Sequence, residues 1–148
     1  ATLGVGEIFK TDLLTQVVSA SASQILTDAH HQRRYSIRLR VSDGVFVIDF
    51  RNGQTGSFTM FNKSPFTAPE TLWVHRVSAK EFTWYRGASD SELTKIAEIQ
   101  FDTDPGVLFV GLQACSKPAR FDNLKILEAA EDFGDGVRAD VPSEEDDR

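Results

Sequence analysis

The chain is 148 residues long, and its 41% hydrophobic and 26% charged residues are typical of one globular domain with a substantial core. The single cysteine, Cys115, excludes an intrachain disulfide and a cysteine-based metal site. No apolar run is long enough for a membrane-spanning helix. Residues 128–148 carry nine acids and two bases, a net of −7, which leaves +1 for the rest of a chain whose total is −6. This balance argues against nucleic-acid binding.

The N-terminal quarter of the chain gives weak signals. Residues 16–23 are a weak strand candidate, and residues 13–29 are a weak helix candidate because their apolar positions form no clean helical stripe. The first strong signal is at residues 35–41, where apolar and polar side chains alternate and predict a strand with one buried and one solvated face. After turn residues at 42–44, residues 45–50 are apolar on both faces and predict a central strand.

The remainder of the body reads as short apolar runs separated by turn residues. Further strands are expected at residues 57–61, 71–78, 81–86, 93–101, 107–114 and 119–127. Two prolines between residues 63 and 69, and the sequence Asp104-Pro105-Gly106, mark breaks between them. Many short strands at this spacing predict an all-β sandwich or barrel, without alternating helices.

The last of these strands shows a break in its alternation. Phe121 has the opposite parity to Leu124 and Ile126, so a β-bulge at Asp122-Asn123 is needed to bring all three to the core. The expected core residues are Tyr35, Ile37, Leu39, Phe46, Ile48, Phe50, Val110, Leu112, Phe121, Leu124 and Ile126.

Four short motifs follow one another between residues 72 and 127. They are Leu72-Trp73-Val74-His75-Arg76, Glu81-Phe82-Thr83-Trp84-Tyr85, Val110-Gly111-Leu112-Gln113-Ala114-Cys115 and Arg120-Phe121-Asp122-Asn123-Leu124-Lys125-Ile126. Their order resembles that of concanavalin A-like, laminin-G-like jelly-roll domains. The Trp-bearing and Val-Gly strands also resemble the β-sandwich module named after farnesoic acid O-methyltransferase. Either resemblance implies an antiparallel β-sandwich that works mainly as a binding module, extracellular or carried on a multidomain chain. We therefore expect one jelly-roll domain at residues 1–127, followed by an acidic tail or linker at 128–148.

The first candidate site combines aromatic and polar side chains on two neighbouring strands: Trp73, His75, Trp84, Tyr85 and Arg86. A sugar site needs an aromatic platform for the apolar face of a pyranose and a few polar groups for its hydroxyls. The alternative is burial, because Trp84 shares its face with Phe82, and burial of at least one tryptophan in the core is favoured.

A second candidate is a basic stripe of Arg34, Arg38 and Arg40 on the solvated face of its strand. Arginines favour bidentate contacts with sulfate or carboxylate groups. The plainer interpretation is a solvated strand face on which Asp49 of the next strand offsets one of the charges.

A third candidate consists of oxygen ligands for calcium, namely Asp102, Asp104, Asp122 and Asn123. Calcium is the one cofactor that the sequence offers, and the alternative roles of these residues are a turn and a β-bulge.

No catalytic arrangement emerges, since the three histidines are scattered and Glu98 is alone in its strand. Cys115 is expected to be a buried or half-buried free thiol. The sequon Asn62-Lys63-Ser64, in an expected loop, would indicate an extracellular location if it were glycosylated.

The acidic tail has the composition of a disordered segment. Its apolar anchors are Phe133, Val137 and Val141, which recur at four-residue intervals. They could dock on the chain's own sandwich or, as the favoured alternative, on a neighbouring copy. Ordering the tail also requires main-chain hydrogen bonds, for example by strand addition to a sheet edge, and the basic stripe is a candidate electrostatic partner.

These observations favour a non-catalytic, extracellular or cell-surface recognition or adhesion module whose preferred ligand class is carbohydrate. The alternative is a structural subunit of an assembly or filament, in which the sandwich and tail make chain-chain contacts. The expected partners are a glycan or other protein chains, including a homo-oligomer or filament, with no nucleic acid and no membrane span.

Overall fold

The computed structural model describes residues 1–28, 35–53, 57–137 and 143–145. Over these ranges every strand pairs antiparallel with its neighbours, and no helix long and apolar enough to cross a membrane occurs. The strands are β1 (Glu7–Leu13), β2 (Ser21–Thr27), β3 (Tyr35–Ser42), β4 (Val45–Asn52), β5 (Ser57–Pro65), β6 (Glu70–Arg76), β7 (Glu81–Arg86), β8 (Thr94–Gln100), β9 (Phe109–Cys115), β10 (Phe121–Glu128) and β11 (Ser143–Glu145).

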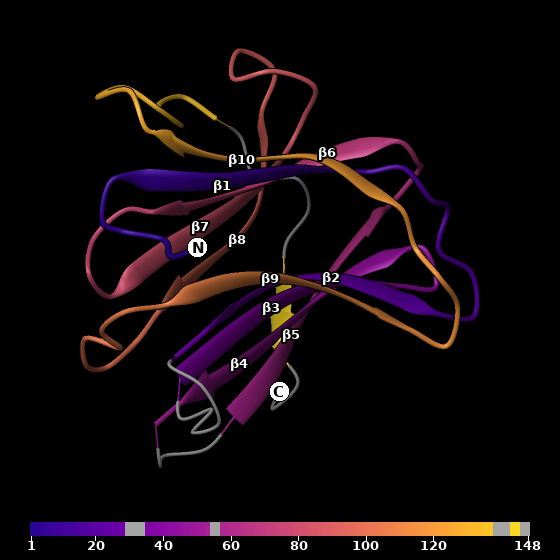
Figure 1. Cartoon of the computed structure of the whole chain (residues 1–148), viewed down its shortest axis with the longest axis horizontal. Coiled ribbons are helices and arrows are strands. Elements are labelled where there is room, and N and C mark those ends of the chain that lie inside the picture. The colour runs from indigo at the N-terminus through magenta and orange to yellow at the C-terminus, as the bar shows by residue number, and fades with distance from the viewer. Residues whose placement is uncertain (29–34, 54–56, 138–142, 146–148) are drawn as a thin grey trace.

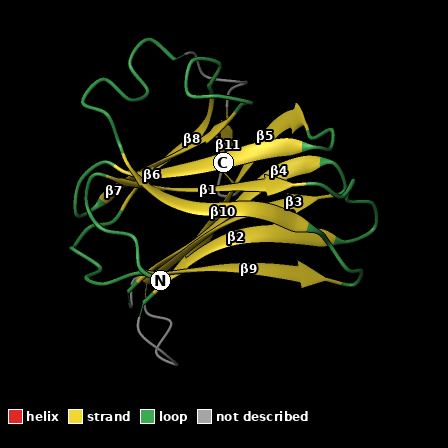
Figure 2. Ribbon diagram, turned by 45° about the horizontal axis from the view of Figure 1, so that its top comes forward, coloured by secondary structure: helices red, strands yellow, loops and turns green. Residues whose placement is uncertain are grey.

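The strands form two sheets that face each other (Figure 1). One sheet has five strands in the order β10-β1-β6-β7-β8, and the other has six in the order β11-β5-β4-β3-β2-β9. Loops and turns join the strands around the rim of both layers (Figure 2). The predicted antiparallel β-sandwich is therefore confirmed.

The core lies between the sheets and is built by the period-2 alternation of β3, β4, β6 and β7. Ile37, Leu39, Phe46, Ile48 and Phe50 are buried as predicted. Five more of the predicted core residues are partly buried against this cluster: Tyr35, Val110, Leu112, Phe121 and Ile126.

The strand β10 contains the predicted bulge. Its pairing with β1 shifts between Lys125 and Asp122, and Asn123 has a positive φ of 53°. The bulge brings Phe121 and Ile126 to the same side. Leu124 was predicted in the core, and this is wrong: it is 52% exposed, because it lies within the bulge of an edge strand.

The N-terminal elements differ from the sequence prediction. The weak strand expected at residues 16–23 is β2 at Ser21–Thr27, and residues 13–29 form no helix over the part that is described. The strand β1 was missed because it lacks simple alternation. Phe9 and Leu13 pack in the main core, whereas Ile8 is buried on the opposite face of the sheet.

The acidic tail packs on its own chain. Phe133 and Val137 pack against a small cluster on the outer face of the five-stranded sheet, and the main chain of β11 then pairs with β5 at the edge of the other sheet. Figure 1 shows the gold tail segment outside one sheet and yellow β11 in the other. The expected strand addition is thus present, and it occurs within the chain. The third proposed anchor, Val141, lies outside the described residues.

Two further predictions, the burial of Cys115 and the loop position of Asn62, are wrong. Cys115 is exposed, because Val110 and Leu112 face the core and residues of the other parity on this edge strand face outward. Asn62 lies in β5 and is fully buried, with its amide nitrogen donating to the carbonyl oxygen of Ile96 at 3.0 Å. The sequon is therefore not in a loop.

Candidate functional site

Two arginines from the basic stripe lie on the outer face of the six-stranded sheet. The inward side chains of β3, among them Ile37 and Leu39, fix the alternation that places Arg38 and Arg40 outward. Asp49 of β4 is the Cα partner of Arg38, so its carboxylate lies between the two guanidinium groups.

Asp49 joins these groups into one network. Its Oδ2 accepts hydrogen bonds from Nε and Nη2 of Arg38, at 2.9 and 2.7 Å, and from Nε of Arg40, at 3.0 Å. Its Oδ1 accepts a bond of 3.2 Å from the hydroxyl of Thr59 on β5. Across the sheet, Nη1 of Arg38 donates to Oε1 of Gln113 on β9 at 3.2 Å. Four strands thus hold one polar cluster in a fixed geometry.

The electrostatics of this cluster leave one positive charge available. Burial alone raises the pKa of the Asp49 carboxyl, but the hydrogen bond from Arg38 and the charges of Arg40 and Arg38 outweigh it and hold the pKa below its usual value. Asp49 is therefore a carboxylate at neutral pH and offsets one guanidinium. The side chains of Arg38, Arg40 and Asp49 are 33%, 27% and 25% exposed, so they remain accessible to a ligand from solvent.

The structure completes this cluster with residues that the sequence did not single out. Thr59, the partner of Asp49, lies on β5, and Gln113, the partner of Arg38, lies on the distant strand β9; no local pattern marks either residue as part of the cluster. Arg34, the third member of the predicted stripe, lies outside the described residues.

The five residues of the aromatic candidate separate into three environments. Trp73, His75 and Tyr85 lie on the outer face of the five-stranded sheet, beside Phe133 of the tail. Trp84 is fully buried on the opposite face, in the main core.

Arg86 is engaged near the rim of the core. It forms an ion pair with Glu70, donates to the hydroxyl of Ser64 and to the carbonyl oxygen of Pro65, and its guanidinium lies 4.8 Å from the ring centroid of Phe46. These contacts join the end of β5 to the start of β6 and take the guanidinium away from the other aromatic candidates.

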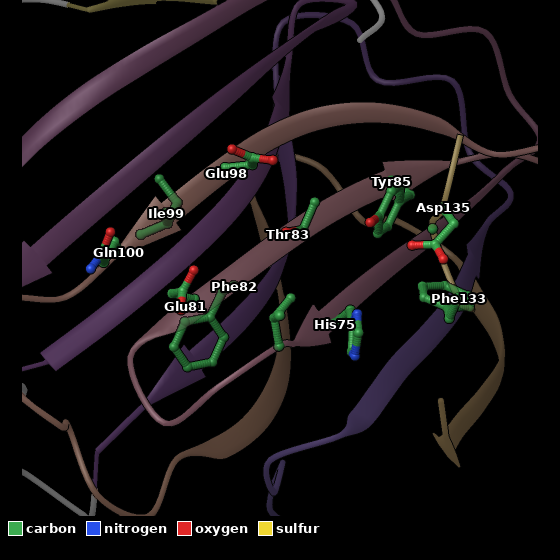
Figure 3. A pocket seen from close by; sticks show the side chains of 12 residues that line it. His75, Glu81, Phe82, Thr83, Tyr85, Glu98, Ile99, Gln100, Phe133 and Asp135 are labelled. Carbon is green, nitrogen blue, oxygen red and sulfur yellow. The ribbon is translucent and has the colours of Figure 1, made fainter. Parts of the chain in front are cut away.

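A cleft of about 440 Å³ runs along the outer face of β6, β7 and β8, with the tail as one wall (Figure 3). Its lining includes His75, Tyr85, Glu98, Phe133 and Asp135. Burial lowers the pKa of His75. Burial, followed by the charge of Glu98, raises the pKa of Tyr85, with a smaller contribution from Asp135. The hydroxyl of Tyr85 therefore stays protonated.

The four calcium candidates do not form one site. Asp104 lies 3.5 Å from Arg76 at the end of β6, and Asp102 accepts a hydrogen bond from Asn52. Asp122 and Asn123 lie at the start of β10. There Asp122 pairs with Asp12 of β1, which in turn pairs with Thr71 near the start of β6. Within the described ranges, no group of three or more His, Cys, Asp or Glu side chains is placed to hold a metal ion.

The comparisons with known proteins define the fold class. No protein family model and no curated protein sequence matches the chain. A protein of unknown function from Saccharomyces cerevisiae superposes with a TM-score of 0.63 at 12% identity, over 88% of this chain and 73% of that one. Ligand-free congerin I superposes with a TM-score of 0.58 at 11% identity, over 86% of this chain and 95% of that one. Congerin II liganded with lactose and MES superposes with a TM-score of 0.51 at 14% identity, over 85% and 94% of the two chains.

The congerins are therefore among the structures whose fold the chain resembles, and this fold is the concanavalin A-like jelly roll that the four sequence motifs predicted. At 11–14% identity these superpositions establish the architecture of the chain.

Proposed function

We propose that the chain is a non-catalytic carbohydrate-binding module whose ligand contacts the polar cluster of Arg38, Arg40, Asp49, Thr59 and Gln113. The observation that carries the proposal is the pair of guanidinium groups held on either side of the Asp49 carboxylate. Sugar hydroxyls need donors and acceptors in fixed positions, and this cluster supplies charged groups of both kinds on an exposed sheet face. The lactose in the congerin II structure supports the ligand class.

The charge of the cluster narrows the expected ligand. Two arginines and one carboxylate leave a net +1, so sugars that carry a carboxylate or sulfate group gain an additional contact over neutral ones. Within the described part of the chain, Nη1 of Arg40 has no hydrogen-bond partner and is the group best placed for that contact. We place this module outside the cell or at the cell surface, where such glycans are presented.

The test is titration with lactose and with a set of sulfated and sialylated oligosaccharides. Arg38→Ala and Arg40→Ala are expected to weaken the binding of the best ligand by about tenfold or more, because each removes a guanidinium group that donates charge-assisted hydrogen bonds. Arg120→Ala removes an exposed arginine that lies outside the cluster and is the matched control. Absence of binding to the whole set, or full binding by the Arg40→Ala variant, would exclude the proposal. Loss of binding in His75→Gln alone would move the site to the other sheet.

A structural subunit of an assembly is the alternative function. The expectation behind it was a tail that docks on a neighbouring copy, but two of its three anchors and its strand pairing are satisfied within one chain. The carbohydrate proposal therefore has the stronger support.

A further inference from the structure

The segment 129–137, here called the strap, lies across the outer face of the five-stranded sheet. Among the described residues, one main-chain hydrogen bond joins it to the sandwich, from the N–H of Ala129 to the carbonyl oxygen of Gly6 at 2.8 Å. Its other main-chain bonds are internal turns, such as those from Phe133 to Ala130 and from Val137 to Gly134. Side-chain contacts must therefore contribute most of the attachment of the strap to the sheet.

The main contact is the ring of Phe133 in an aromatic slot formed by Trp73, His75 and Tyr85. The Phe133 centroid lies 5.2 Å from that of His75 and 5.4 Å from that of Tyr85, with both ring pairs nearly perpendicular, and 6.1 Å from that of Trp73. Figure 3 shows His75, Tyr85 and Phe133 together at one end of the cleft. These edge-to-face arrangements are the preferred geometries of aromatic pairs.

The slot is separate from the core between the sheets. Trp73 and Tyr85, with Ile8, form their own buried cluster, against which Phe133 packs. Trp73 is 3% exposed and Tyr85 is 6% exposed. A solvated outer sheet face is normally polar, so large aromatic groups at this position require a covering partner.

The slot also selects the residue that follows the phenylalanine. Gly134 has a φ of +82°, and a Cβ at this position would lie 2.3 Å from the hydroxyl oxygen of Tyr85. Any other residue would meet both backbone strain and a collision. The slot therefore recognises a Phe-Gly pair.

Charge defines the remainder of the ligand. The strap contains Glu131, Asp132 and Asp135 and no basic residue. At the margin of the slot, the ammonium group of Lys10 lies 4.4 Å from the ring centroid of Trp73. This positive charge is suited to an acidic segment, and the negative charge of Glu98, on the other side of the slot, is offset by Lys95 at 2.7 Å.

We infer that the slot of Trp73, His75 and Tyr85 is a peptide-binding site for an acidic segment with a Phe-Gly pair, held closed by the chain's own strap as an intramolecular ligand. The site lies on the sheet opposite to the polar cluster, so it does not depend on carbohydrate binding. Because the strap is tethered at Ala129, its effective concentration at the slot is high, and a free peptide competes poorly until the strap is displaced.

The test uses the full-length chain and a synthetic peptide with the sequence of residues 129–137. In Phe133→Ala the slot is vacant, and the peptide is expected to bind saturably, with a change in the fluorescence of Trp73 and in the NMR signals of the His75 ring. Wild-type protein is expected to bind the same peptide at least about tenfold more weakly. Gly134→Ala keeps the phenyl ring, but its Cβ would collide with the Tyr85 hydroxyl and prevent the ring from entering the slot. This variant is expected to bind the peptide as Phe133→Ala does.

Peptide variants provide the matched controls. Peptides with alanine in place of Phe133 or of Gly134 are expected to lose at least about tenfold in affinity for the open slot. Equal binding of the peptide to wild type and to both variants, or no binding to either variant at about 1 mM, would overturn the inference. A wild-type dimer that both variants convert to monomer would show that the strap docks on a second copy, which would overturn the intramolecular assignment.

Discussion

The indole N–H of Trp84 donates a hydrogen bond of 2.9 Å to Oε1 of Gln24, and this bond joins the two sheets through the core. Trp84 belongs to β7 and Gln24 to β2, and both side chains are fully buried. The amide nitrogen of Gln24 donates in turn to the carbonyl oxygen of Leu72 at 3.3 Å. Each buried polar atom of the glutamine side chain thus has a partner, as a stable core requires.

Gln24→Met should destabilise the protein by about 1–3 kcal/mol, because it leaves the Trp84 indole N–H buried without an acceptor. Urea unfolding monitored by circular dichroism measures this loss. In the Trp84→Phe background the donor is absent, so the same change at Gln24 should cost clearly less. Equal costs of Gln24→Met in the two backgrounds would show that the hydrogen bond contributes nothing to the stability of the fold.

Asp49 should make stability depend on pH in the acid range. The folded-state pKa of its carboxyl lies below the usual value of 3.8, so the unfolded chain binds the proton more readily. The stabilisation is fully present above about pH 4 and is lost as the pH falls through the folded-state pKa. Asp49→Asn should lack this component, so the difference in unfolding free energy between wild type and variant should shrink on acidification. Asp90→Asn makes the same chemical change at an exposed loop position and controls for the loss of one negative charge. A difference that stays constant with pH would contradict the assigned role of the two arginines.

Regular alternation made the central strands predictable, whereas burial on both faces concealed β1. In β3, Ile37 and Leu39 face the core between the sheets, and the alternate residues of the strand face solvent. This is the pattern that sequence reasoning detects best. In β1, Ile8 is buried beneath the tail and Phe9 is buried between the sheets, so adjacent residues are both apolar. The burial of Ile8 depends on Phe133, which is far along the chain, and no local pattern reveals it.

The candidate site was predictable only in its local part. The alternation of β3 placed Arg38 and Arg40 on one face, and the neighbouring strand supplied Asp49. Gln113 is 75 positions from Arg38 and reaches it because β9 pairs with β2, a long-range pairing that hairpin spacing does not predict. The two tryptophans of the sequence motifs, by contrast, lie on opposite faces of one sheet. Because Trp73 stands between the apolar residues Leu72 and Val74, alternation does not show which face it occupies.

Cys115 should react rapidly with a thiol reagent in the native protein at neutral pH, because it is exposed at the end of β9. Its labelling rate in buffer should approach the rate in urea. Cys115→Ser should change the unfolding free energy by less than about 0.5 kcal/mol, since the side chain faces outward on an edge strand. Labelling that requires denaturant would show instead that this end of β9 is covered in solution.

Arg76 should be the charged residue whose loss is most damaging to the fold. Its side chain is 5% exposed, and it donates to the carbonyl oxygens of Leu3 at 2.8 Å and of Ala79 and Gly106 at 2.9 Å. It therefore ties three separate segments to the end of β6. Burial lowers the pKa of this guanidinium, but an arginine remains charged at neutral pH.

Arg76→Met keeps the apolar stem and leaves three carbonyl groups without their donor, so it should lower the free energy of unfolding in urea by about 3–5 kcal/mol. Asp104→Asn removes its largely exposed ion-pair partner and should cost less than about 1 kcal/mol. If Arg76→Met unfolds at the wild-type urea concentration, these three hydrogen bonds do not hold the loops together.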